Sequence, residues 1–105
     1  MKQTKLYLLK CVAKKECVYP HITVEPGDTF YFSPNAASRE MSDVWHVNPY
    51  RCICPGHSLP FVRNEKHAKT WQVERYASKI KRIIESEGEF DVEVITLTIQ
   101  YEIIK

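Results

Sequence analysis

The 105-residue sequence contains no long apolar run, and this absence excludes two classes of protein. A membrane-spanning helix needs roughly 20 consecutive apolar residues, and no stretch approaches that length. The early apolar run Leu6–Leu9 is ended by Lys10 and is too short for the core of a signal peptide. We therefore expect a protein without membrane association in the cytoplasm, where thiols remain reduced.

A strong excess of either charge is also missing. The formal net charge is +2, which excludes the acidic surface of a DNA mimic and is too small to indicate nucleic-acid binding by itself. The charges are unevenly distributed along the chain. Residues 63–82 carry seven basic and two acidic side chains, whereas residues 85–105 carry six acidic and one basic. A basic segment is thus followed by an acidic one, and the two can neutralise each other across a packed helix and strand.

Proline is absent after Pro60, and the chain has neither internal repeats nor low-complexity segments. All six prolines lie between Pro20 and Pro60, which indicates a loop-rich first half and a regular second half. The composition, with 44% hydrophobic and 27% charged residues, is that of a globular protein. We expect residues 1–105 to form a single domain.

The alternation of apolar residues predicts an α+β fold with a sheet of four or five mostly antiparallel strands and one long helix. The expected strands cover residues 5–12, 22–24, 29–32, 44–53 and 90–104. The second and third of these flank the turn signal Pro26-Gly27-Asp28, so a hairpin is expected there. In the last strand the apolar positions are even up to Val94 and odd from Ile95. This switch requires a bulge, a sharp bend or burial on both faces of the strand.

The long helix is predicted from about Glu65 to Glu87. Asn64 is a suitable N-cap and Gly88 a suitable residue to end the helix. Apolar residues recur three and four positions apart, which is the spacing of one buried stripe. The members of this stripe are Val73, Tyr76, Ala77, Ile80, Ile83 and Ile84.

The four cysteines fall into two pairs, Cys11/Cys17 and Cys52/Cys54, and His57 closely follows the second pair. Structural zinc takes four ligands in tetrahedral geometry, and two pairs brought together from separate turns are a usual way to supply them. Neither pair has the C-x-x-C spacing of a redox motif. In a small domain without disulfides, the paired cysteines predict a metal site that staples the fold.

We therefore predict one structural Zn²⁺ held by Cys11, Cys17, Cys52 and Cys54. In the main alternative His57 replaces one of the cysteines, and His46 is a weaker candidate. A further alternative is that the thiols are buried core residues, and this suits Cys11 because it shares a strand face with Tyr7 and Leu9. Four protein ligands leave no open coordination position, so the predicted zinc is structural and not catalytic.

No catalytic arrangement is indicated by the sequence. Cys52 or Cys54 as nucleophile, with His57 or His46 as base, lacks an acidic residue placed to orient the base. The protein is therefore expected to bind a partner and not to be an enzyme. An alternative is a zinc-containing nucleic-acid-binding module that uses the basic helix over residues 65–87. In that interpretation Trp71 could stack on a base, although a tryptophan in such a place more often packs in the core or at its rim.

In overall make-up the chain resembles the small zinc-containing anti-CRISPR proteins of phages and prophages, which inhibit type II RNA-guided nucleases. The resemblance rests on the short chain, the cysteine pairs Cys11/Cys17 and Cys52/Cys54, the single helix and the long final strand. It implies a larger partner in the host cytoplasm, a lobe of the nuclease, and inhibition by blocking guide or target-DNA loading. It transfers no binding residue. From the basic positions of the predicted helix we expect partner contacts at Lys66, Lys69, Arg75, Lys79 and Arg82.

Overall fold

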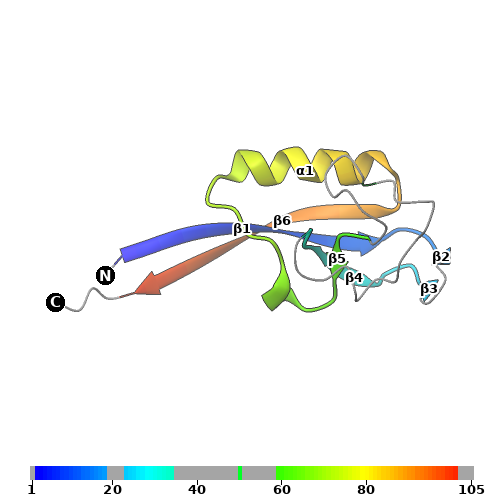
Figure 1. Ribbon diagram of the computed structural model, residues 1–105, viewed down its shortest axis with the longest axis horizontal. Coiled ribbons are helices and arrows are strands. Elements are labelled where there is room, and N and C mark those ends of the chain that lie inside the picture. Colours follow the sequence, from blue (N-terminus) through cyan, green and yellow to red (C-terminus); the bar gives the residue numbers. More distant parts are fainter. Residues whose placement is uncertain (1, 19–22, 35–49, 51–58, 102–105) are drawn as a thin grey trace.

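An antiparallel sheet with one helix on one of its faces forms the body of the protein in the computed structural model, which describes residues 2–18, 23–34, 50 and 59–101 (Figure 1). The elements are β1 (Lys2–Ala13), β2 (Cys17–Val18), β3 (Thr23–Val24), β4 (Thr29–Phe32), β5 (Phe61–Val62), the 3₁₀ helix η1 (Glu65–His67), α1 (Glu74–Ser86) and β6 (Phe90–Tyr101). The sheet has the strand order β5-β4-β1-β6, and β2 pairs with β3 in a separate small sheet. The predicted α+β class, the four-stranded antiparallel sheet and the single α-helix are confirmed.

The two long strands form one uninterrupted ladder, from Lys2 opposite Tyr101 to Ala13 opposite Phe90. An unbroken register leaves no place for a bulge. The switch in the apolar positions of β6 therefore reflects burial on both faces. Val92 and Val94 lie on the face that α1 covers, whereas Ile95 and Leu97 lie on the opposite face and pair across the ladder with Leu8 and Leu6.

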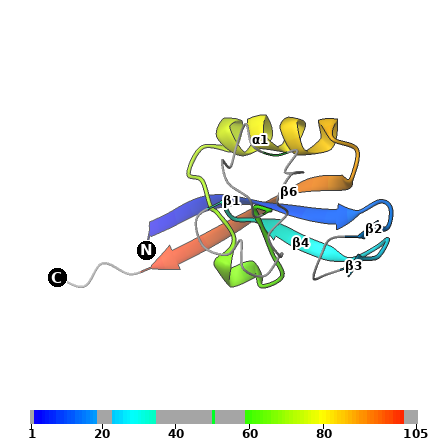
Figure 2. The same cartoon turned by 45° about the vertical axis from the view of Figure 1, so that its right-hand side comes forward.

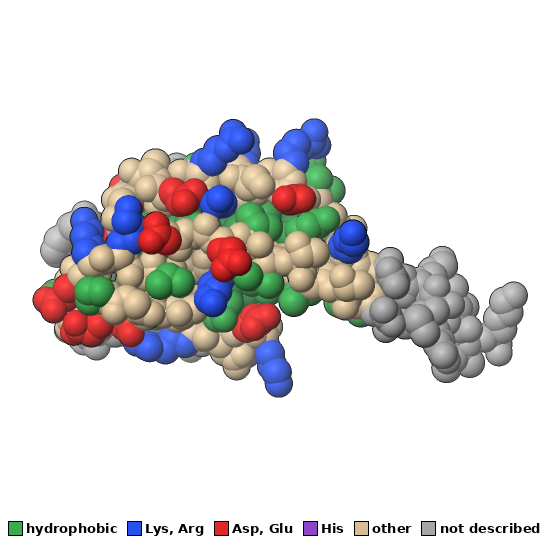
Figure 3. Space-filling model, turned by 180° about the vertical axis from the view of Figure 1, so that it is seen from behind, with side chains coloured by type: hydrophobic (Ala, Val, Ile, Leu, Met, Phe, Trp, Pro, Cys, Tyr) green, Lys and Arg blue, Asp and Glu red, His purple; other side chains and the backbone are tan. Residues whose placement is uncertain are grey.

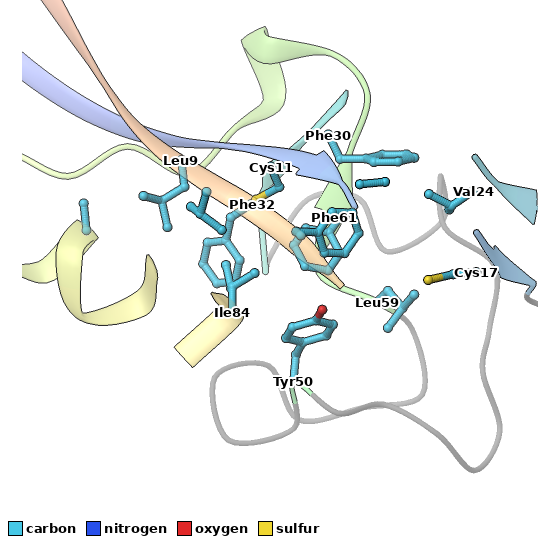
Figure 4. Close-up of a cluster of buried hydrophobic side chains, with 14 residues drawn as sticks. Leu9, Cys11, Cys17, Val24, Phe30, Phe32, Tyr50, Leu59, Phe61 and Ile84 are labelled. Atoms are coloured by element: carbon cyan, nitrogen blue, oxygen red, sulfur yellow. The ribbon is translucent and has the colours of Figure 1, made fainter. Parts of the chain in front are cut away.

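The core lies between α1 and the inner part of the sheet, and it is rich in phenylalanine (Figure 4). The rings of Phe30 and Phe90 meet edge to face at 6.1 Å between centroids, and Phe61 lies 4.8 Å from Phe90. From the helix, Ala77 and Ile84 are fully buried against these side chains. Aromatic contacts of this kind add to the hydrophobic gain from burial, so this cluster is the main source of stability.

The predicted helix over 65–87 is wrong in its first part. Residues 65–67 form only the turn η1, and α1 begins at Glu74. Between them, the backbone of Trp71 exchanges two hydrogen bonds of 2.9 Å with Tyr7 of β1, which holds this stretch in an extended conformation. Asn64 is a cap as expected, but of η1, since its side chain accepts a hydrogen bond from the Lys66 amide. Gly88 ends α1 with a positive φ of 77°, as predicted.

The stripe predicted for the helix is correspondingly shorter than expected. Ala77 and Ile84 are buried, and Ile80 packs against the core from a partly buried position. Val73 and Tyr76 are exposed instead, by 42% and 50%. Because α1 starts at Glu74, Val73 is only its N-cap residue and does not continue the buried stripe.

The predicted hairpin of 22–24 with 29–32 is also wrong. β3 pairs with β2, and β4 pairs with β1 on one side and β5 on the other. The turn between β3 and β4 forms as expected, with Gly27 at a φ of 92°. It docks on the end of β1, because the Gly27 amide donates to the Ala13 carbonyl and the Ala13 amide to the Asp28 carbonyl. The predicted strand over 44–53 lies outside the described residues, apart from Tyr50.

The molecule is elongated, with extents of 52 × 24 × 22 Å. Figures 1 and 2 show the reason: the open end of the β1–β6 ribbon projects beyond α1 and the smaller strands. Among the described elements, α1 and the smaller strands lie at the other end of the ribbon, which we call the closed end.

Candidate functional site

A hydrogen-bonded triad joins three distant parts of the chain at the closed end of the ribbon. Glu89 lies in the turn between α1 and β6, and its carboxylate accepts two side-chain bonds. The Cys17 thiol donates to Oε2 at 3.1 Å, and the Tyr50 hydroxyl donates to Oε1 at 3.0 Å. Tyr50 is fully buried, with its ring edge-on to Phe61 at 4.9 Å. The triad thus anchors residue 50 and the start of β2 to the same carboxylate.

Cys11 has a different environment from Cys17, although the sequence pairs them as zinc ligands. Its side chain is fully buried on the α1 face of the sheet, opposite Phe30 and Val92. This burial, and secondarily the charge of Glu85, raises the pKa of the Cys11 thiol far above its ordinary value. Zinc binds the thiolate. The surroundings of Cys11 favour the neutral thiol and count against it as a ligand.

The two thiols are also separated in space. Figure 4 shows Cys11 and Cys17 at different sides of the core cluster, with Phe61 between them in the view. In the described part of the chain, no group of three or more His, Cys, Asp or Glu side chains is placed to hold a metal ion. The other predicted ligands, Cys52 and Cys54, and the alternatives His57 and His46, lie outside the described residues.

Three of the five basic residues expected at the partner interface do lie together. Arg75, Lys79 and Arg82 are exposed along one face of α1 and, with Ser78, line a hollow of about 510 Å³. We call these three residues the basic stripe. Their spacing of four and three residues places them on neighbouring turns of one helix face. Figure 3 shows Lys and Arg side chains projecting along the margin of the molecule that α1 forms.

The remaining two basic residues lie elsewhere. Lys66 belongs to η1, which is on the other side of the sheet from α1 (Figure 1). It lines a second hollow, of about 480 Å³, whose walls include Leu8 and Leu97 from the sheet face opposite α1. The Lys69 amide donates to the Phe32 carbonyl, which fixes this residue to β4. The five predicted contact residues therefore form two surfaces and not one.

Of two aromatic side chains that could contact a partner, Tyr76 is exposed and Trp71 is packed against the core. The Arg75 guanidinium lies 5.2 Å from the ring centroid of Tyr76, and this tyrosine is half exposed. Trp71 instead stacks on Phe32 at 5.9 Å and packs against the core. The predicted role of Trp71 as a platform for a nucleic-acid base is not supported by this packing.

Acidic side chains of β6 partly neutralise the basic side chains on the side of α1 that faces the sheet, as the charge distribution suggested. A groove of about 520 Å³ between α1 and β6 is lined by Lys81 and Arg82 from the helix and by Glu93 from the strand. Within the helix, Lys81 lies 3.8 Å from Glu85. The positive field is therefore strongest on the side of α1 that faces away from the sheet.

Sequence reasoning did not single out the Cys17–Tyr50–Glu89 triad. Its members are 33 and 39 residues apart, so no local spacing marks them. The only available signal was the position of Glu89 directly after the helix-ending Gly88, where a side chain turns back toward the sheet.

No protein-family model, curated protein or solved structure matches the chain. Among its described helices, none combines the length and the apolar character needed to cross a membrane.

Proposed function

We propose that the protein is a non-enzymatic binding protein that docks on an acidic surface of a larger protein through the outer face of α1. The observation that carries this proposal is the basic stripe next to an exposed tyrosine. Arg75, Lys79 and Arg82 supply charge, and Tyr76 supplies apolar area that is 50% exposed. Arginine and tyrosine are the residue types most enriched among those that dominate binding energy at protein interfaces.

The resemblance to anti-CRISPR proteins gives the partner a candidate identity, a type II RNA-guided nuclease. Such nucleases hold their guide and target strands in positively charged channels. A protein with a basic docking face has the wrong charge to occupy such a channel as a mimic of DNA. Inhibition would instead follow from binding an acidic region of a lobe and blocking the loading of nucleic acid.

A nucleic-acid-binding module is the second candidate, and the basic stripe is also the observation in its favour. Three cations on one helix face can contact successive phosphates. With a net charge of +2 and Glu93 beside the helix, the long-range positive field is small, because exposed charges are screened within about 8 Å at physiological salt. Trp71, the side chain that could have stacked on a base, packs on Phe32 instead. We therefore favour the protein partner.

We further propose a structural zinc that uses Cys17, Cys52 and Cys54, with His57 as the fourth ligand in place of Cys11. The apolar enclosure of Cys11 argues for this version of the predicted site. Position in the chain supports it too, because Glu89 joins Cys17 to Tyr50, and Cys52 follows Tyr50 by only two residues. To bind zinc as a thiolate, Cys17 would have to give up the proton that it donates to Glu89.

Metal analysis of the purified, reduced protein tests the zinc proposal. We expect close to one zinc per chain, lost in Cys17→Ser and in Cys52→Ser/Cys54→Ser but retained in Cys11→Ala. Removal of the metal should lower the melting temperature, because a metal that binds only the native state contributes its binding energy to folding. Metal-free protein after mild purification would contradict the proposal, and loss of zinc in Cys11→Ala would restore the all-cysteine ligand set.

A cleavage assay tests the proposed function directly. Added protein should inhibit DNA cleavage by a purified type II RNA-guided nuclease, and Arg75→Glu/Lys79→Glu/Arg82→Glu should abolish the inhibition. The matched control is Lys5→Glu/Lys14→Glu/Lys15→Glu, which makes the same change in net charge at exposed positions off the helix. Unchanged inhibition by the stripe variant would refute the docking face. Tight binding to bare DNA or RNA that weakens steeply with salt would favour the second candidate.

A further inference from the structure

The outer edge of β6 has no strand partner within the part of the chain that the structure describes, because β6 ends the order β5-β4-β1-β6. An open edge presents unpaired N–H and C=O groups and is a template for another strand. Near the closed end of the ribbon the edge is protected by Asp91 and Glu93, since charged side chains discourage pairing. From Ile95 to Ile99 it contains no charge, proline or glycine.

This unprotected segment reads the same in both directions, Ile-Thr-Leu-Thr-Ile. We propose that it pairs antiparallel with the same segment of a second copy of the chain, around a two-fold axis at Leu97. In that register Ile95 faces Ile99 of the second copy, Thr96 faces Thr98, and Leu97 faces Leu97. A two-fold interface must be self-complementary, and a palindromic strand satisfies that condition residue by residue.

The faces of the strand agree with this register. Directly opposed residues of an antiparallel pair lie on the same face. Thr96 and Thr98 are exposed on the α1 face, so threonine would meet threonine there. On the other face, Ile95 and Leu97 are half-buried and Ile99 is 44% exposed. The second copy would cover Ile99 with Ile95, which is a favourable aliphatic cross-strand pair.

Charge is compatible with this register and disfavours registers nearer the closed end of the ribbon. With the axis at Leu97, Glu93 faces position 101 of the second copy, so acidic residues do not meet. A register centred on Val92 would place Asp91 against Glu93 at two positions, and like charges directly opposite each other are destabilising. The pairing would join two four-stranded sheets into one and place both copies of α1, with their basic stripes, on the same face.

Pairing over five residues is a small interface, so we expect a modest affinity. Sedimentation equilibrium over a range of concentrations therefore tests the proposal. The protein should shift from one chain to two as its concentration rises. Thr96→Lys/Thr98→Lys should remain monomeric, since each new lysine faces another across the axis. The matched control, Gln72→Lys/Ser86→Lys, adds the same charge at exposed helix-side positions and should dimerise like the parent chain. Thr98→Lys alone, which opposes lysine to threonine, should show a weakened dimer.

Two variants with opposite charges distinguish loss of the interface from loss of folding. Thr96→Glu/Thr98→Glu should also be monomeric alone, and mixing it with the lysine variant should restore a dimer that contains one chain of each. A dimer that survives the lysine substitutions, or a mixture that stays monomeric, would overturn the proposal. A parent chain that stays monomeric up to about 1 mM would also overturn the proposal. The open edge of β6 would then be available to pair with a strand of another protein.

Discussion

The two halves of the β1–β6 ribbon share one unbroken ladder and differ in what covers them. In the inner ribbon, residues 9–13 with 90–94, the apolar side chains face α1 and are mostly buried. In the outer ribbon, residues 4–8 with 95–99, the aliphatic side chains lie on the opposite face, and their exposure rises from Leu8, which is buried, to Ile99, which is 44% exposed. The shared backbone ladder therefore does not decide which side chains are buried. Burial follows from what packs on each face, which is α1 on the inner ribbon and the segment 64–70 beside Leu8 on the outer ribbon.

The largest effect should come from a cavity next to the inner ribbon. Phe61→Ala removes a fully buried ring that contacts Phe32, Tyr50 and Phe90, and it should destabilise the fold by about 3–5 kcal/mol. Ile99→Ala in the outer ribbon should cost less than about 1 kcal/mol, because that side chain is already 44% exposed. Urea denaturation of dilute protein measures both, and similar losses for the two variants would contradict the distinction between the halves.

This difference explains which parts of the fold could be predicted from sequence. Residues 90–94 and 95–99 each alternate cleanly, so both halves of β6 were recognisable as strand. The helix was extended too far because nothing between Lys66 and Gln72 breaks a helix locally. What holds that stretch extended is the bridge from Trp71 to Tyr7, a contact over 64 residues that no local pattern reveals.

The candidate site was less accessible to prediction for the same reason. The basic stripe follows from helical spacing and could be identified, but the position of Lys66 on the opposite side of the sheet depends on where the chain turns before α1. The Cys17–Tyr50–Glu89 triad depends on β2, residue 50 and the turn after α1 meeting in space. β5 has only two residues, too few to show any period, so the correct neighbour of β4 was hidden.

The next largest effect should come from the polar anchor at the closed end of the inner ribbon. Glu89→Gln leaves one oxygen to accept a bond and turns an amide donor toward the other partner, so the bond from either Cys17 or Tyr50 to this side chain is lost. A hydrogen bond to a charged acceptor contributes about 1.5–3 kcal/mol. The control Glu87→Gln changes an exposed carboxylate and should be neutral within about 0.5 kcal/mol. Equal melting temperatures for the two variants would show that the triad does not contribute to stability.

Alkaline pH should weaken the inner ribbon through Cys11. Burial raises the pKa of its thiol in the folded protein, so above the ordinary value of 9.0 the unfolded chain releases a proton that the folded protein keeps. Stability is therefore retained below about pH 9 and falls above it, by at most about 1.4 kcal/mol per pH unit. Cys11→Ala should show a smaller decline over this range in denaturant titrations. Parallel pH profiles for the two proteins would contradict the burial of Cys11.

The smallest effect is expected from charge placed on the outer ribbon. Thr96→Lys/Thr98→Lys changes two exposed side chains and should alter the unfolding free energy of the monomer by no more than about 0.5 kcal/mol. Thermal melts of dilute protein, compared with the parent chain, measure this change. A loss of several kcal/mol would show that these two side chains are not exposed in the folded monomer.

Amide hydrogen exchange along β6 tests the division of the ribbon most directly. In dilute protein, the amides of residues 90–94 that bond to β1 should exchange only through global unfolding, and those of residues 97–99 should exchange much faster through local opening. Raising the protein concentration should slow the outer amides alone, because the second copy covers them. Uniform protection along the whole strand in dilute protein, unchanged by concentration, would contradict both the division and the pairing.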